Sequence, residues 1–137
     1  MNSPEAKELP PSISEGALIY LVDDEPLLVD LAEMALQPVG YRIKKFSCAS
    51  TALESLSADP DQPDLLITDY SMSPMNGAEL AEQCKRLRPN LKIAMVSGTA
   101  GPEVLVSTRV RIDGFLPKPY RPFALVELVR SVLAEKS

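Results

Sequence analysis

Histidine is absent from this chain of 137 residues, and so is tryptophan. Without histidine the chain cannot build a Ser–His–Asp triad or the histidine-containing clusters that commonly bind zinc. It also cannot carry a phosphohistidine of its own. The only cysteines, Cys48 and Cys84, lack the CxxC spacing of redox and zinc motifs. We therefore expect both to be small buried side chains in a reducing compartment.

Long apolar runs and basic clusters are missing as well. No apolar stretch approaches the roughly 18 residues that a membrane-spanning helix needs, and residues 1–16 lack the apolar core of a signal peptide. The formal net charge of −5 disfavours binding to nucleic acid. We expect a cytoplasmic protein without direct membrane or nucleic-acid partners. Residues 1–16 should form a disordered leader and residues 17–137 one domain.

The chain instead contains a regular alternation of short apolar runs and helical patterns. The apolar runs span 17–22, 41–46, 65–68, 91–96 and 115–117, and the helical patterns span 26–37, 49–58, 78–87 and 121–135. Strands that alternate with helices of this length predict parallel βαβ units. We therefore predict an α/β domain with a doubly wound, five-stranded parallel sheet, in which the lysine-containing run 41–46 is an edge strand.

Two segments carry more detailed expectations. The apolar stripe of the helix over 26–37 consists of Leu28, Leu31, Ala32 and Ala35, and we expect it to face the core. Residues 100–113 combine glycine, proline and several β-branched residues, so we expect a short or irregular helix there. Residues 104–112 could form a dimer surface or an irregular part of the core.

Polar residues stand at the ends of four of the apolar runs. Asp23 and Asp24 follow the first run, Asp69 the third, Ser97 the fourth and Lys118 the last. Because the carboxyl ends of parallel strands share one edge of the sheet, these side chains should converge there. Three carboxylates without histidine or thiolate favour Mg²⁺ or Mn²⁺, and a lysine with a hydroxyl beside them suits an oxyanion.

Four motifs carry a resemblance to a known family. Taken in order and at their gaps, LVDDE, LLITDYSMSPMNG, MVSGTA and GFLPKPY resemble the receiver domain of two-component response regulators, over residues 17 to about 135. The resemblance implies a flavodoxin-like three-layer sandwich with strand order 2-1-3-4-5. It also implies Mg-dependent transfer of a phosphoryl group from a histidine kinase or phosphotransfer protein, later hydrolysis, and conformational switching toward a downstream effector. Beyond its own phosphorylation and dephosphorylation, such a domain would not be an enzyme.

The resemblance assigns the acidic residues to two roles. Asp69 would be the phosphoacceptor, and Asp23, Asp24 and Asp69 would hold the metal. The family adds a backbone carbonyl as a further metal ligand, which here belongs to Ser71. Ser71 also stands where the family tunes the rate of phosphate loss. Independently of the family, the acidic pair could simply cap the helix that begins at Pro26.

The resemblance also assigns the remaining polar residues. Ser97 and Lys118 would bind the phosphoryl group, with Thr99 as the rival of Ser97 and a further position that tunes dephosphorylation. The peptide before Pro119 is usually cis in the family, which would aim the lysine. Ser97 and Phe115 would form the switch, with a plain core aromatic as the alternative for Phe115.

One motif departs from the family pattern. Ser73 occupies the place of a common proline and Pro74 follows it, while Gly77 keeps its usual distance from Asp69. The loop therefore keeps its length, but its bend moves by one residue because proline restricts its own φ and the residue before it.

Two other functions remain to be weighed. A phosphorylation-independent interaction module would keep the fold alone. A phosphatase of the haloacid-dehalogenase type would need a second aspartate two residues after Asp69, where this chain has Ser71. The sequence leaves open the cognate kinase, the oligomeric state, the phosphoryl lifetime, and whether the chain stands alone or is part of a longer protein.

Overall fold

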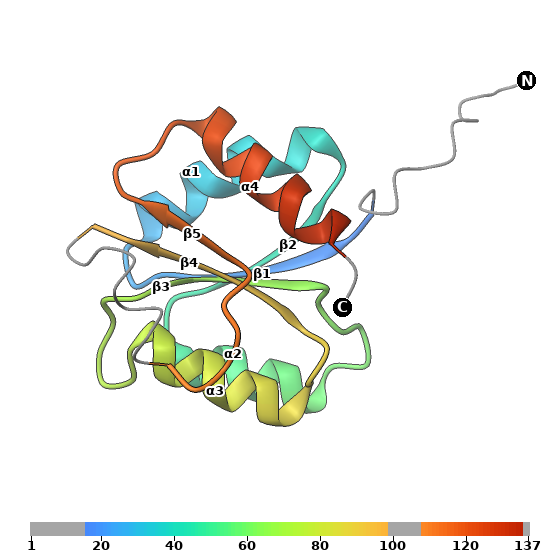
Figure 1. Cartoon of the computed structure of the whole chain (residues 1–137), viewed down its shortest axis with the longest axis vertical. Coiled ribbons are helices and arrows are strands. Elements are labelled where there is room, and N and C mark those ends of the chain that lie inside the picture. The colour runs from blue at the N-terminus through green and yellow to red at the C-terminus, as the bar shows by residue number, and fades with distance from the viewer. Residues whose placement is uncertain (1–15, 99–107, 136–137) are drawn as a thin grey trace, which may run out of the picture.

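The computed structural model describes residues 16–98 and 108–135 (Figure 1). Within these residues lie the strands β1 (Leu18–Val22), β2 (Arg42–Phe46), β3 (Leu65–Asp69), β4 (Lys92–Ser97) and β5 (Gly114–Pro117). The helices described are α1 (Pro26–Leu36), α2 (Ala49–Ala58), α3 (Gly77–Leu87) and α4 (Pro122–Ala134), with a short 3-10 turn η1 (Gln37–Val39) after α1. These bounds lie within one residue of the ranges that the sequence predicts.

The strands form one parallel sheet in the order β2-β1-β3-β4-β5, which confirms the predicted topology. Helices α1 and α4 cover one face of this sheet, and α2 and α3 cover the other (Figure 1). The result is the three-layer sandwich that the resemblance implies. In such a sheet the carboxyl ends of β1, β3, β4 and β5 meet at one edge.

The core consists of two large clusters, one on each face of the sheet. Every residue of β1 and β3 is buried, as expected for continuous apolar runs in the middle of a parallel sheet. Ile19 and Ile67 belong to the cluster under α1 and α4, whereas Tyr20 and Leu66 belong to the cluster under α2 and α3. Alternate side chains of each strand therefore anchor opposite helical layers, which fixes where the strand ends lie.

Strand β2 is an edge strand with paired lysines, as predicted. Lys44 forms an ion pair with Asp59 at 2.9 Å, and Lys45 pairs with Asp30 at 3.1 Å and with Glu33 at 2.9 Å. These exposed pairs add little to stability. Charged side chains along the edge do, however, discourage another strand from adding to it.

The predicted inward stripe of α1 is wrong in part. The buried residues of this helix are Val29, Ala32 and Leu36. Leu31 is instead 49% exposed, and Leu28 and Ala35 are half-buried. The difference arises because α1 carries apolar residues around more than one side, and the contacts with the sheet decide which side is covered.

Of the two cysteines, Cys84 is buried as predicted, but the prediction for Cys48 is wrong. Cys48 is half-exposed and stands at the N-terminal end of α2. Its Sγ lies 3.4 Å from the hydroxyl oxygens of both Ser50 and Thr51. The hydrogen bonds with Ser50 and Thr51 lower the pKa of the Cys48 thiol to about 7. The polar end of a helix, rather than the core, thus surrounds this thiol.

Several predictions concern segments outside the described residues. The proposed leader lies there except for Gly16. Of the predicted irregular helix over 100–113, the structure describes 108–113, and these residues form no helix. Among the helices described, none combines the length and apolar character needed to cross a membrane.

Candidate metal-binding site

The four strand ends bring the predicted polar residues together. Asp69 and Ser97 are the last residues of β3 and β4, while Asp23 and Lys118 directly follow β1 and β5. The register confirms the alignment, since Asp69 pairs with Val96 across β3 and β4. Residues separated by up to 95 positions therefore share one edge of the sheet.

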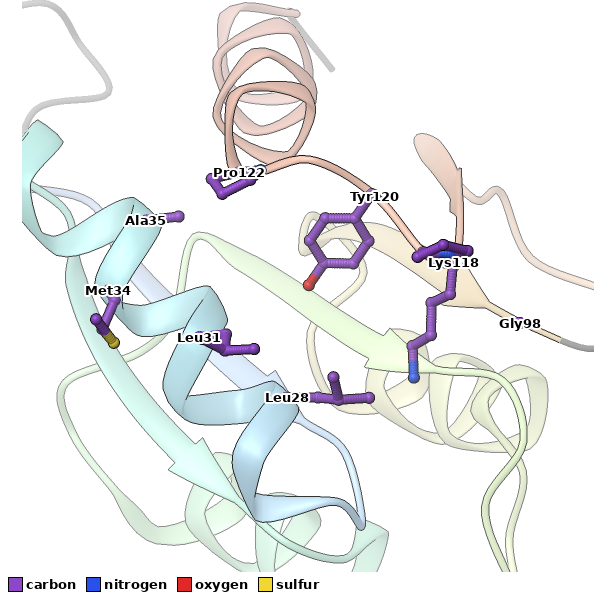
Figure 2. A pocket seen from close by; sticks show the side chains of 9 residues that line it. Leu28, Leu31, Met34, Ala35, Gly98, Lys118, Tyr120 and Pro122 are labelled. Atoms are coloured by element: carbon purple, nitrogen blue, oxygen red, sulfur yellow. The ribbon is translucent and has the colours of Figure 1, made fainter.

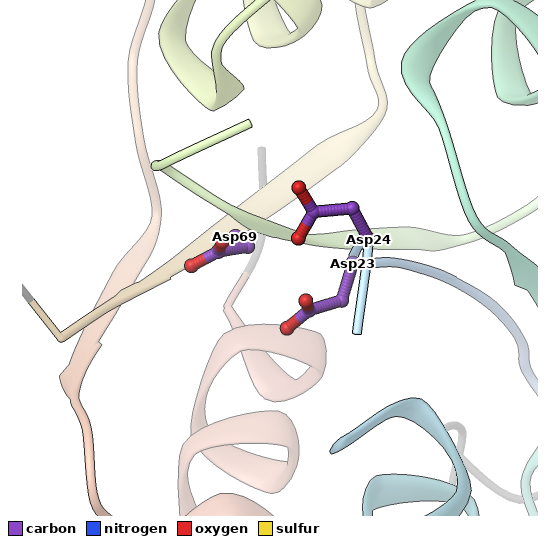
Figure 3. Close-up of side chains that lie close together, drawn as sticks. All are labelled: Asp23, Asp24 and Asp69. Atoms are coloured by element: carbon purple, nitrogen blue, oxygen red, sulfur yellow. The ribbon is translucent and has the colours of Figure 1, made fainter. Parts of the chain in front are cut away.

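The acidic side chains form a compact cluster. Asp23, Asp24 and Asp69 each offer a carboxylate oxygen, and these oxygens all lie within 4.8 Å of one another (Figure 3). Asp23 and Asp69 are buried, whereas Asp24 is exposed at the rim. An oxygen-only donor set of this kind suits a hard divalent cation such as Mg²⁺ or Mn²⁺. The exposed side at Asp24 is where a cation held by these three residues would meet solvent.

The start of α1 orients Asp23. The backbone N–H of Glu25 donates to Asp23 Oδ1 at 3.0 Å, and Pro26 occupies the first turn of the helix. The backbone N–H groups of Leu28 and Val29 donate to the carbonyl of Glu25. The N-cap residue of α1 is Glu25 and, among the described residues, no side chain caps this helix, so the alternative that the acidic pair caps it is wrong. Asp23 Oδ1 instead holds the turn before α1.

Lys118 reaches across the edge to two of the carboxylates. Its Nζ lies 3.0 Å from Asp23 Oδ2 and 3.1 Å from Asp69 Oδ1. Burial acts to lower the pKa of Lys118, but the hydrogen bonds with Asp23 and Asp69 outweigh it and raise the pKa above its usual value. The peptide between Lys118 and Pro119 is cis, as predicted. Lys118 therefore stays positively charged and neutralises part of the acidic cluster.

Asp69 is the carboxylate of this cluster whose pKa is raised. Burial raises the pKa of Asp69, the hydrogen bond and charge of Lys118 oppose the rise, and the nearby charges of Asp23 and Asp24 add to it. The fold thus lets Asp69 keep its proton to a higher pH than a free aspartate would. A cation at the cluster would compete with the proton for this carboxylate.

This shift predicts how stability without metal depends on pH. Because the folded-state pKa of Asp69 lies above the unfolded value of 3.8, Asp69 favours folding most below pH 3.8. That contribution is lost as pH rises through the raised pKa. An Asp69→Asn protein stays neutral at this position, so its stability relative to wild type should increase from below pH 3.8 to neutral pH. Urea unfolding in EDTA measures the difference, and a constant difference across this range would contradict the assignment.

The other predicted site residues have mixed outcomes. Ser97 is 1% exposed, and its carbonyl accepts the backbone N–H of Lys118 at 2.8 Å. Ser97 and Lys118 therefore lie side by side at the strand ends. Ser71 lies exposed in the loop after β3. Thr99, the rival of Ser97, lies outside the described residues. Phe115 is half-buried on β5, and its role as a switch stays a prediction.

The loop after Asp69 returns tightly to the sheet. A side chain on Gly77 would overlap the carbonyl oxygen of Asp69, and its Cβ would lie 2.9 Å from the Cα of Tyr70. A capping box between Asn76 and Glu79 then starts α3. Glycine at position 77 is therefore needed for α3 to begin against the backbone of Asp69. The Ser73–Pro74 peptide within this loop is cis.

Sequence reasoning missed an apolar groove beside the site. It has a volume of about 730 Å³ and lies between α1 and the segment that joins β5 to α4 (Figure 2). Its walls include Leu28, Leu31, Met34, Lys118 and Tyr120. Lys118 belongs both to the groove and to the acidic cluster, and burial raises the pKa of the Tyr120 hydroxyl. The excess of apolar residues in α1 was the signal that could have revealed it.

Comparisons with known proteins agree with this geometry. The family model described as the response regulator receiver domain matches residues 19–130. The chain is 32% identical over 118 residues to the "Putative two-component response regulator ARR21" of Arabidopsis thaliana, covering 86% of this chain and 19% of that protein. It is 26% identical to "Response regulator SaeR" of Staphylococcus epidermidis, covering 87% of this chain and 51% of that protein. The chain thus spans about half or less of these curated relatives.

Two further comparisons concern a kinase and a solved structure. The chain is 29% identical to "Sensor kinase CckA" of Brucella abortus, covering 90% of this chain and 13% of that protein. A CheY-like receiver domain protein from Methanospirillum hungatei JF-1 superposes with a TM-score of 0.79 at 28% identity, over 87% of this chain and 94% of that one.

Proposed function

This chain belongs to the family of response regulator receiver domains, and on that premise we propose that it accepts a phosphoryl group on Asp69 and converts this event into a conformational change. The observation that carries the proposal is the position of the Asp69 carboxylate, 3.1 Å from Lys118 and within 4.8 Å of two further carboxylates. Cation and lysine together would offset the charge of an incoming phosphoryl group.

The proposed transfer uses few covalent steps. A carboxylate oxygen of Asp69 attacks the phosphorus of a phosphohistidine, the P–N bond breaks, and the histidine nitrogen keeps the electron pair. The Lys118 ammonium and the Ser97 hydroxyl would hold the phosphoryl oxygens. Water later hydrolyses the aspartyl phosphate, which releases inorganic phosphate and returns Asp69 to its free carboxylate. We propose no reaction on any other substrate.

Mg²⁺ or Mn²⁺ is the proposed cofactor. Asp23, Asp24 and Asp69 would hold the ion, with the backbone carbonyl of Ser71 as a further ligand. When bound, the ion supplies positive charge and orientation for the phosphoryl oxygens. In the structure Lys118 binds Asp23 and Asp69, so it already partly neutralises the carboxylates that the cation would use.

A second protein must supply the phosphohistidine, because this chain has no histidine. We propose a histidine kinase or phosphotransfer protein as this partner; a downstream effector would read the new state. Because a kinase that uses ATP acts in the cytoplasm, we propose that this chain is phosphorylated there. One curated relative, named a sensor kinase, contains a segment similar to this chain, which supports a link to kinases.

The groove beside Lys118 supports a docking position for this partner. Met34 and Leu27 on α1 are each 69% exposed, and Phe123 at the start of α4 is 73% exposed. Of these residues Met34 lines the groove itself, together with Leu28 and Leu31, and the groove reaches the acidic cluster through Lys118 (Figure 2). We propose that a helix with apolar side chains next to the donor histidine packs there, because the donor must reach Asp69 across this edge.

Docking on this surface predicts that a variant can lose transfer from a protein donor while keeping transfer from a small molecule. The double variant Leu31→Asp/Met34→Asp should slow transfer from a phosphorylated kinase at least tenfold, because it places charge in an apolar interface. The same protein should react normally with acetyl phosphate. The kinase would be the sensor kinase that labels wild type fastest in a purified panel. Leu87→Asp on α3 is the matched control, and equal transfer to all three proteins would contradict the docking position.

The test of the proposed function is phosphorylation by acetyl phosphate. With Mg²⁺, the intact mass of the wild-type protein should increase by one phosphoryl group, and EDTA should abolish the increase. Asp24→Asn should raise the Mg²⁺ concentration needed for labelling, since it removes the ligand at the rim. A protein that gains no mass and does not respond to beryllofluoride with Mg²⁺ would instead be a phosphorylation-independent interaction module.

A further inference from the structure

A small hydrophobic cluster lies beside the site on the α2–α3 face of the sheet. Its buried members are Ala78 and Met95, and the partly buried Tyr70, Ile112 and Phe115 pack against them. It is distinct from the two large clusters of the core. The cluster thus connects the residue that follows Asp69 with the aromatic residue of β5.

The backbone of Tyr70 is held from several sides. Its N–H donates to the carbonyl of Val96 at 2.8 Å. Its carbonyl accepts the N–H of Met72 at 3.1 Å and the N–H of Gly77 at 2.9 Å. Tyr70 is also bonded directly to Asp69. A displacement of Asp69 therefore moves Tyr70 together with the end of β4 and the start of α3.

The side chains of the cluster continue this connection across the sheet. Thr68, Met95 and Phe115 are Cα partners on three neighbouring strands, so their side chains share one face. Met95 is fully buried, and both Tyr70 and Phe115 pack against the pair that it forms with Ala78. Methionine is unbranched and flexible, so it can change its rotamer when a neighbouring ring shifts.

We propose that Tyr70 is a positioning residue that transmits the phosphorylation state of Asp69 to Phe115 through the packing of Met95. The inference rests on the proposed phosphorylation of Asp69. A phosphoryl group adds bulk and negative charge to Asp69 and draws Lys118 toward its oxygens. The backbone of Asp69 and Tyr70 adjusts, the ring of Tyr70 moves against Met95, and Phe115 repacks. This route requires no hydroxyl on residue 115.

Such a route works as a population shift. A densely packed cluster has a few discrete arrangements rather than a continuous range. Phosphorylation shifts their populations only if Asp69 interacts differently with each of them. The ring of Tyr70 supplies that difference, because it is the part of the cluster that is covalently next to Asp69. A smaller side chain at position 70 should leave the phosphoryl site intact but disconnect Phe115 from it.

The experiment uses beryllofluoride with Mg²⁺ as a phosphoryl-like probe and amide NMR spectra as the readout. In wild type, the amide signals of both Asp24 and Phe115 should shift on addition of the probe. Tyr70→Phe keeps the ring and should behave like wild type. Tyr70→Ala should keep the shift of Asp24 but lose more than half of the shift of Phe115. Leu53→Ala is the matched control and should keep both shifts. Leu53 is partly buried against the large cluster under α2 and α3 and does not belong to the small cluster.

The outcomes separate this inference from the proposed function. A full Phe115 shift in Tyr70→Ala, with Asp24 responding, would overturn the role of Tyr70 alone. Wild type that shows neither shift would overturn the proposed phosphorylation and the coupling with it. If Tyr70→Ala fails to fold, judged by loss of dispersed amide signals, Tyr70→Leu replaces it. That variant keeps apolar bulk without a ring, and the same two results decide.

Discussion

An Asp69→Asn protein is expected to gain no phosphoryl group from acetyl phosphate with Mg²⁺ under conditions that label wild type fully. Asparagine keeps the size of the side chain and its place at the end of β3, but its amide is a poor nucleophile and carries no charge. The loss should therefore be complete rather than partial. Intact mass spectrometry measures it directly.

The matched control for this prediction is Asp30→Asn. Asp30 is an exposed aspartate of α1 that pairs with Lys45 at 3.1 Å and lies outside the acidic cluster. Its replacement should leave labelling unchanged. Labelling of Asp69→Asn at the wild-type rate would mean that another residue accepts the phosphoryl group.

Replacing Lys118 with methionine should produce the second large effect. Lys118 contacts Asp23 and Asp69, whose side chains are 10% and 6% exposed. Methionine keeps most of the length of the side chain but leaves these carboxylates unpaired. Breaking a buried pair in this way costs about 3–5 kcal/mol. Because Asp24 keeps the cluster open to water, we expect a loss at the lower end of that range when EDTA is present.

The same variant should also be phosphorylated slowly. Removing one preorganised positive group from a transfer site typically lowers the rate by about 10²–10³-fold. Mg²⁺ should stabilise Lys118→Met more than wild type, because the cation no longer competes with an ammonium group for Asp23 and Asp69. Thermal unfolding with and without Mg²⁺, together with the rate of mass gain, tests both effects.

Lys44→Met serves as the control for Lys118. Lys44 pairs with Asp59 at 2.9 Å, but its side chain is 44% exposed on the edge strand. Such a pair contributes about 0–1 kcal/mol, so its loss should barely change stability and should not affect labelling. Two lysine variants with the same phenotype would argue against a special role for Lys118.

The strands and the convergence of the site were predictable from the sequence for a clear physical reason. A strand buried on both faces needs a continuous apolar run, and LIYLV of β1 and LLIT of β3 supply it without interruption. A charged residue at the end of such a run marks the edge of the sheet, where it can meet other polar groups. The parallel topology then brings Asp23, Asp69 and Lys118 to the same edge, which local sequence and one rule of connection suffice to predict.

The failures concern features that depend on tertiary neighbours. Leu31 has the right spacing for a core position, but the sheet covers only the side of α1 that carries Val29, Ala32 and Leu36. The groove beside Lys118 exists because α1 and the segment after β5 stand apart, and no local pattern encodes that distance. Cysteine is usually a buried side chain, yet Cys48 stands at the start of α2, and this position determines its surroundings.

The most direct test is to locate the phosphoryl group itself. After brief incubation with acetyl phosphate and Mg²⁺, sodium borohydride reduces an aspartyl phosphate to homoserine, and peptide mass spectrometry then identifies the altered residue. We expect homoserine at position 69 alone, and none when EDTA replaces Mg²⁺. Homoserine at position 23 or 24, or a borohydride-resistant phosphate on Ser71 or Ser97, would contradict the assignment of Asp69 as the acceptor.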